Sequence, residues 1–134
     1  LFEGTKFVSV TSCTTNKGLN GTAVIRSNVF NYDTHTYGLH RGKMPALRQV
    51  KPIEYYRDRN KDGKTDETGQ IYRDIIYVNI HGATYRRGSK QIATRIDGWS
   101  EGCIVLNDNA YYENFINLVK NQKYFSFVIL KEFN

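Results

Sequence analysis

The sequence predicts a mostly β domain with one or two helices, of the α+β class, and three observations support this prediction. Short runs of β-branched and aromatic residues recur between turns rich in Gly and Asn. The near-continuous apolar run Ile75–Ile80 is typical of a strand that is buried on both faces. Apolar residues at helical spacing follow Asn107. Because 134 residues suffice for one core, we assign residues 1–134 to a single domain.

The first third of the chain is expected to be β-structure. A strand-like run at 6–11 is followed by the turn-rich segment 16–21, and a short β-branched run lies at 22–26. We expect these two runs to pair as a hairpin through the turn. The stretch 32–42 is rich in aromatic residues, His and Gly, and its pattern predicts no particular element.

The middle of the chain contains the most strongly apolar strand between two polar segments. A polar loop is expected at 57–70, and the strand at 75–80 then runs directly into His81 and Gly82. The Arg-rich segment 83–99 is expected to be a long loop or a hairpin.

An amphipathic helix is predicted near the end of the chain. Either Asn107 or Asp108 can cap its first turn. Its apolar face, spaced i, i+3, i+4 and i+7, comprises Tyr112, Phe115, Ile116 and Val119. Lys120 and Lys123 lie near the expected end, where positive charge suits the helix dipole. The run Tyr124–Leu130 predicts a closing strand.

Charge and hydropathy narrow the classes of partner. The net charge of +6 and pI of about 9.3 favour anionic partners, or reflect a solvated basic surface. The basic residues are scattered and accompany no recognition motif, so we expect no nucleic-acid partner. No apolar run approaches the roughly 20 residues of a membrane helix, so we expect no integral membrane segment. The chain begins at Leu1 without the pattern of a signal peptide, and we interpret it as a mature or trimmed form.

The two cysteines occur in different surroundings. Cys13 lies in a Ser/Thr-rich stretch, whereas Cys103 follows Gly102 and opens an apolar run. One disulfide between them would suit an oxidising compartment, but the asymmetry favours two independent thiols, one of them reactive. A glycine before a thiol permits φ > 0 or close approach of a substrate, and the amides at 102 and 103 can donate to an oxyanion. The alternative is a buried cysteine beside a turn.

His81 follows the buried strand, at a place where a rigid scaffold can present a catalytic group. A cysteine nucleophile needs a His that accepts the thiol proton and returns it to the leaving group. A single His at a strand end is more often structural, and only the combination with Cys103 favours the catalytic interpretation.

The pattern His81-Gly82, a loop, and then Ser100-Glu101-Gly102-Cys103-Ile104 resembles the catalytic domain of L,D-transpeptidases (YkuD-type family). That family's signature is His-Gly-Thr, a spacer and Ser-His-Gly-Cys followed by an apolar residue. The segment CIVLNDNAYYENFINLV and the closing run at 124–130 are also similar to the strand, helix and last strand of the family. The resemblance covers residues 75–130 well and residues 1–70 only loosely.

The resemblance implies a β-sandwich-like fold whose cysteine attacks the carbonyl of a peptidoglycan stem tetrapeptide. The acyl group would then pass to an amine, as L,D-transpeptidation, or to water, as L,D-carboxypeptidation. Cys103 would be the nucleophile and His81 its base, with the Gly82 carbonyl orienting the imidazole. The amides of Gly102 and Cys103 would form the oxyanion hole, and Ser100 belongs to the same catalytic motif. The resemblance implies no catalytic metal or cofactor and an extracytoplasmic location, in the periplasm or at the cell surface.

This chain departs from the family pattern at three points. Glu101 replaces the His before Gly-Cys, Val105 replaces an Arg that the family often carries, and the His and Cys are 22 positions apart, a longer interval than usual. Glu101 and Arg95 are candidates for contacts with substrate. Trp99 either walls the pocket or belongs to the core. Arg86, Arg87 and Lys90, together with Arg95, are further candidate anchors, or they simply solvate the surface.

Two other polar groups have weaker signals. His35 and His40 have no metal-site spacing, and we interpret both as structural. The loop 58–69 matches the first part of a calcium loop but carries Gly69 where a bidentate Glu is required. It is either a structural calcium site or an Asx-turn loop.

The alternative to an enzyme is a binding module of the same fold that docks on the cell wall without catalysis. The departures at Glu101 and Val105 favour this alternative.

Overall fold

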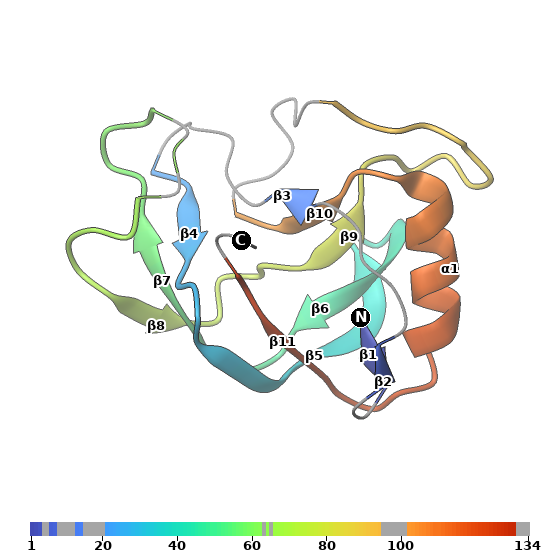
Figure 1. Cartoon of the computed structure of the whole chain (residues 1–134), viewed down its shortest axis with the longest axis horizontal. Helices are drawn as coiled ribbons and strands as arrows, with labels where there is room; N and C mark the ends of the chain where they lie inside the picture. The colour runs from blue at the N-terminus through green and yellow to red at the C-terminus, as the bar shows by residue number, and fades with distance from the viewer. Residues whose placement is uncertain are drawn as a thin grey trace.

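The fold is described from a computed structural model, which describes residues 1–3, 6–7, 13–14, 21–62, 64, 66–94 and 102–130. In chain order its elements are β1 (Phe2–Glu3), β2 (Lys6–Phe7), β3 (Cys13–Thr14), β4 (Ala23–Ile25), β5 (Phe30–His40), β6 (Met44–Gln49), β7 (Ile53–Arg57), β8 (Tyr72–Asp74), β9 (Ile80–Gly82), β10 (Ile104–Leu106), α1 (Asn109–Val119) and β11 (Phe125–Val128). Figure 1 shows these strands with α1 at one side. The prediction of a mostly β, α+β domain is confirmed at this level.

The largest sheet has six strands in the order β11-β5-β6-β9-β10-β3, and a three-stranded sheet has the order β4-β7-β8. β1 and β2 form a separate pair. Neighbouring strands are antiparallel except for β9 and β10, which are parallel. β9 lies between β6 and β10, so both of its edges are paired and its three residues are buried. This central position makes β9 a rigid place for a reactive side chain.

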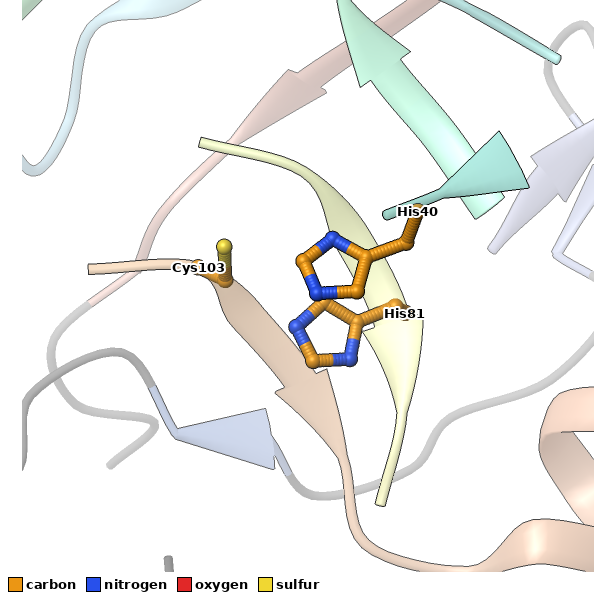
Figure 2. Close-up of side chains that lie close together, drawn as sticks. All are labelled: His40, His81 and Cys103. Carbon is orange, nitrogen blue, oxygen red and sulfur yellow. The ribbon is translucent and has the colours of Figure 1, made fainter. Parts of the chain in front are cut away.

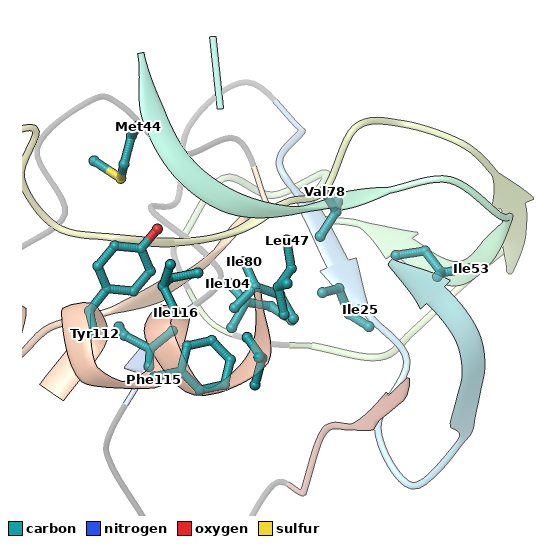
Figure 3. Close-up of a cluster of buried hydrophobic side chains, with 12 residues drawn as sticks. Ile25, Met44, Leu47, Ile53, Val78, Ile80, Ile104, Tyr112, Phe115 and Ile116 are labelled. Carbon is teal, nitrogen blue, oxygen red and sulfur yellow. The ribbon is translucent and has the colours of Figure 1, made fainter. Parts of the chain in front are cut away.

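The predicted helix and its cap are confirmed. Asp108 is the N-cap, and its side chain accepts a hydrogen bond from the Tyr111 amide at 3.1 Å. The buried face of α1 contains the four predicted apolar residues and also Asn109. Figure 3 shows Tyr112, Phe115 and Ile116 directed toward a core that includes Leu47, Ile80 and Ile104. Among the described residues, no helix has the length and apolar character needed to cross a membrane.

The prediction of a strand over Ile75–Ile80 is wrong for most of that run. Only Ile80 belongs to β9, and residues 75–79 have irregular backbone, with Tyr77 at φ +59° and 69% exposed. The cause is the side chain of Gln49, which replaces a partner strand. Its Oε1 accepts from the amides of Ile76 (3.1 Å) and Val78 (3.0 Å), and its Nε2 donates to the Asp74 carbonyl (3.0 Å).

The predicted hairpin between 6–11 and 22–26 is described only in part, because residues 8–11 lie outside the described residues. β2 pairs with β1, and β4 pairs with β7, a partner more than 25 residues further along the chain. The intended turn, up to residue 20, lies outside the described residues. The unassigned stretch 32–42 falls mainly in the long strand β5, and the closing strand is present as β11, paired with β5.

Candidate active site

Parallel pairing of β9 and β10 brings His81 and Cys103 to one place. The register pairs Ile80 with Ile104 and His81 with Val105, so Cys103 lies directly before β10 and beside the start of β9. The Ile104 amide donates to the Asn79 carbonyl at 2.9 Å and fixes this end of the pair. The two predicted catalytic side chains therefore meet, although 22 positions separate them in sequence.

Gly102 permits the chain to enter β10 at this point. Its φ is +125°, a conformation that side-chain-bearing residues rarely adopt. A Cβ added there would lie 2.9 Å from the Ala23 Cβ and 3.0 Å from the Ala23 carbonyl oxygen. Glycine is thus required both by the backbone angle and by the close approach of β4. Cys103 follows half-buried, with its Sγ 3.7 Å from the Tyr77 carbonyl oxygen. Neither Cys103 nor Cys13 is in a disulfide.

The tautomer of His81 is set by its own neighbour. Its Nδ1 lies 2.8 Å from the Gly82 carbonyl oxygen, which can only accept, so Nδ1 carries the proton. Nε2 is then the nitrogen without a proton, and therefore the one that can accept a proton. Gly82 in turn packs closely against α1, which leaves no room for a side chain. A Cβ added at this position would lie 2.5 Å from the Tyr112 ring. The Gly82 carbonyl thus lies where the resemblance to L,D-transpeptidases implies a group that orients the imidazole.

His40 is a member of this cluster that the sequence interpretation missed. Its ring stacks on His81 with centroids 4.1 Å apart and planes inclined by 19°. One ligand atom from each of His40, His81 and Cys103 lies within 4.8 Å of the others (Figure 2). The interpretation of His40 as structural is therefore incomplete. No signal in its spacing indicated this, because it reaches the cluster from the end of β5. His35 does have a structural role: its Nε2 binds the Val78 carbonyl at 2.7 Å.

Both imidazoles of the stacked pair are neutral near pH 7. Burial, with smaller contributions from His81 and Arg41, lowers the pKa of His40 to about 4. Burial also lowers the pKa of His81, an effect that the Gly82 hydrogen bond opposes and Arg41 reinforces. A neutral His81 can act as a base, whereas an imidazolium could not. The imidazole beside Cys103 is therefore neutral in the resting site.

Cys103 opens onto a cleft of about 650 Å³. The cleft is lined by Leu39, His40, Arg41, Gly42, Arg48, Ile76, Tyr77, Val78, Asn79 and Cys103. Its basic residues are Arg41 and Arg48. The candidate anchors Arg86 and Arg87 instead line a second cavity of about 370 Å³ against α1, so they do not face the nucleophile. Among the described residues, the walls of this cleft come from the β5–β6 hairpin and from residues 76–79.

Several predicted site residues lie outside the described residues. These are Arg95, Trp99, Ser100 and Glu101, so their roles stay predictions. Val105 is described and lies in the core with 1% of its surface exposed. An Arg at that position would be buried without solvent, so an apolar residue suits it.

The His40, His81 and Cys103 cluster is the one group of potential metal ligands found among the described residues. Zinc would require three lone pairs that converge at about 2.0–2.3 Å. In stacked rings the nitrogen lone pairs run side by side, so one ring would have to rotate before both could bind one ion. The observed arrangement fits proton transfer better than coordination.

The predicted calcium loop uses its oxygen atoms for internal hydrogen bonds. Asp58 accepts from the Lys61 amide at 2.8 Å, and Asp62 accepts from the Lys64 amide at 2.9 Å. Glu67, the nearest candidate for the bidentate ligand, accepts from the Ser27 hydroxyl at 2.9 Å and from the Ser27 amide. These contacts favour the Asx-turn alternative.

Comparisons of the chain with protein-family models, with curated proteins and with solved structures gave no match.

Proposed function

We propose that this domain is a cysteine-dependent acyl-transfer enzyme acting on peptidoglycan stem peptides, as an L,D-transpeptidase or L,D-carboxypeptidase. The observation that carries the proposal is the pairing of Cys103 with a neutral His81 whose Nδ1 is held by the Gly82 carbonyl. A tautomer fixed in this way leaves Nε2 to accept the thiol proton. The resemblance of residues 75–130 to L,D-transpeptidases supplies the substrate class.

The reaction would proceed in two halves. His81 Nε2 takes the Cys103 proton, and the thiolate attacks the stem carbonyl to form a tetrahedral oxyanion, with the amides of Gly102 and Cys103 as donors. On collapse, the C–N bond to the terminal D-alanine breaks, and the imidazolium returns its proton to the leaving amine. An acceptor amine or water then loses a proton to His81 and attacks the thioester. The C–S bond breaks and the thiol is restored.

The cleft suits an anionic peptide in size and in charge. A volume of about 650 Å³ lies within the range of roughly 300–1,000 Å³ that is usual for small-ligand sites. Arg41 and Arg48 offer guanidinium groups to carboxylates of the stem, in place of the family Arg that Val105 replaces. Leu39 and Ile76 supply apolar contacts for its methyl-bearing residues.

The finer assignment of the fold rests on the order of elements. β9 with His-Gly, a long connection, Gly-Cys before β10, then α1 and the closing β11 follow the order of the L,D-transpeptidase catalytic domain. We propose that β-sandwich-like fold for this chain, and with it an extracytoplasmic site of action, where such a substrate occurs.

The test is incubation of the purified protein with disaccharide-tetrapeptide muropeptides, followed by mass spectrometry of the products. Loss of the terminal D-alanine indicates carboxypeptidase activity, and cross-linked dimers indicate transpeptidase activity. In parallel, intact-mass analysis after treatment with a carbapenem should detect one adduct, which Cys103→Ala abolishes and Cys13→Ala retains. Absence of both products and adduct would favour the wall-binding module, which binding to purified sacculi would then reveal.

A further inference from the structure

The proton on His40 is positioned by a chain of hydrogen bonds that begins at the backbone. The Gln49 amide donates to Asn79 Oδ1 at 3.2 Å. This contact identifies the oxygen of the Asn79 amide, because a backbone N–H requires an acceptor. The Asn79 Nδ2 therefore faces His40, where it lies 3.0 Å from Nδ1. All three residues are buried, with at most 7% of their surface exposed.

A donating Asn79 amide determines the tautomer of His40. Its Nδ1 must accept, and a neutral imidazole then carries its proton on Nε2. Protonation of the ring would set an Nδ1–H against the Asn79 N–H group, which burial makes still less favourable. The low pKa of His40 agrees with this reasoning. His40 is thus a neutral ring whose second nitrogen is a donor.

The two stacked rings consequently have opposite polarity. His81 carries its proton on Nδ1 and offers Nε2 as an acceptor, whereas His40 accepts at Nδ1 and offers Nε2 as a donor. A neutral His40 matters for a second reason. When His81 takes the thiol proton it becomes a cation, and a charged ring stacked 4.1 Å away would oppose that step. A neutral donor supports the charge separation without this repulsion.

We propose that His40 is a second catalytic residue, whose Nε2–H donates to the negative charge that forms at the Cys103 sulfur when His81 removes its proton. The inference rests on the proposed role of Cys103 as a nucleophile. The ligand atoms of the cluster are within 4.8 Å of each other, so a small side-chain movement on substrate binding closes the contact. Gln49 and Asn79 are positioning residues in this scheme, since they act through His40.

The first test is spectroscopic and needs no substrate. In a Cys13→Ala background, imidazole ¹⁵N shifts should give His40 the Nε2–H form and His81 the Nδ1–H form. Asn79→Asp retains an oxygen acceptor for the Gln49 amide, but it replaces the N–H donor that faces His40 with a second oxygen. Nδ1 of His40 must then donate, so His40 should change to the Nδ1–H form. A His40 that carries its proton on Nδ1 in the parent protein would overturn the proposal.

The second test measures thiolate formation directly through alkylation of Cys103 by iodoacetamide across the pH range. His40→Phe keeps an aromatic ring but removes the donor, and it should lower the rate at pH 7 by about tenfold or more, since hydrogen bonds to charged groups are the strong ones. Asn79→Asp should lower the rate similarly. His40→Gln, which restores an N–H donor, should recover most of the rate, and a merely structural role would not show this rescue.

An alkylation profile that is the same in His40→Phe and the parent protein would contradict the role of His40. A shifted profile in a protein that processes no stem peptide would support the role of His40 and contradict the proposed function. The two proposals can therefore fail separately.

Discussion

Two regions of the molecule meet at the cleft, and they contribute different things. The segment from β9 to β10 contains His81 and Cys103, the groups that would exchange a proton. The β5–β6 hairpin contains His40 and Gln49, which orient protons and hold the backbone of residues 75–79. The comparison teaches that His81 and Cys103 can lie in one recognisable motif while the second histidine beside them, and the side chain that holds residues 75–79, come from a distant part of the chain. The predictions below separate these contributions.

The largest effect is expected from Cys103→Ala, which removes the chemistry of the first region alone. Turnover of stem peptides should fall by about 10⁶-fold, as when members of other catalytic units are deleted. The unfolding free energy should change by less than about 1 kcal/mol, because the half-buried sulfur contributes little core volume. Steady-state kinetics and urea unfolding give both values. Cys13→Ala is the matched control, and a Cys103 variant that retains turnover would refute the mechanism.

Gln49→Leu should damage the second region and, through it, the first. The substitution leaves two amides and two carbonyls around residues 51 and 74–78 without their side-chain partner. We expect a loss of about 3–5 kcal/mol in unfolding free energy. Gln70→Leu, at an exposed position, should cost less than about 0.5 kcal/mol. Equal stability of the two variants in urea would show that Gln49 does not hold this segment.

Acid should weaken the second region through its buried histidines. Burial lowers the pKa of both His35 and His40 to about 4, so the unfolded chain binds their protons more readily. The contribution of the two neutral rings to the unfolding free energy is then fully present above about pH 6.5. It decreases as the pH falls toward 4, by roughly 1 kcal/mol per pH unit for each ring. Urea unfolding at pH 7 and 4.5 measures this change. His40→Gln should flatten the dependence, and an unchanged slope in that variant would contradict the assignment.

A smaller effect is expected at the junction between β4 and the nucleophile. Gly102→Ala places a Cβ on a residue at φ +125° and brings it against Ala23. The substitution should lower the unfolding free energy by about 1–3 kcal/mol and slow the acylation of Cys103. Gly88→Ala is the control, because its φ is +69° but nothing lies within 4 Å of an added Cβ. It should cost about 1 kcal/mol or less. If both variants are equally stable, the contact with Ala23 is unimportant.

The smallest effect is expected in the loop at 58–69. Because its carboxylates already bind amides of the chain, millimolar calcium or EDTA should shift the melting temperature by less than about 1 °C. Differential scanning calorimetry with each addition tests this. A clear rise with calcium, abolished by Asp62→Asn, would restore the calcium alternative.

The sequence allowed the helix, its Asp108 cap and the closing strand to be predicted, because each depends on local periodicity and capping. The proximity of His81 and Cys103 followed from the motif. The irregular backbone at 75–79 was missed, since its amides bind the side chain of Gln49 and composition contains no trace of such a partner. His40 was missed for the same reason. Its role depends on strand pairing across the sheet, not on any residue near it in sequence.

Parallel register between β9 and β10 has a consequence for chain length. Because Ile80 is paired with Ile104, the position of the thiol relative to the imidazole is independent of how many residues join the two strands. The long interval between His81 and Cys103 is therefore a property of the connection alone. The entropic cost of closing a loop grows by only about 0.6 kcal/mol for each doubling of its length. The exposed turn at Gly88 is accordingly a place where a foreign peptide can be inserted, as an epitope or a fluorescent label, without disturbing the thiol–imidazole geometry.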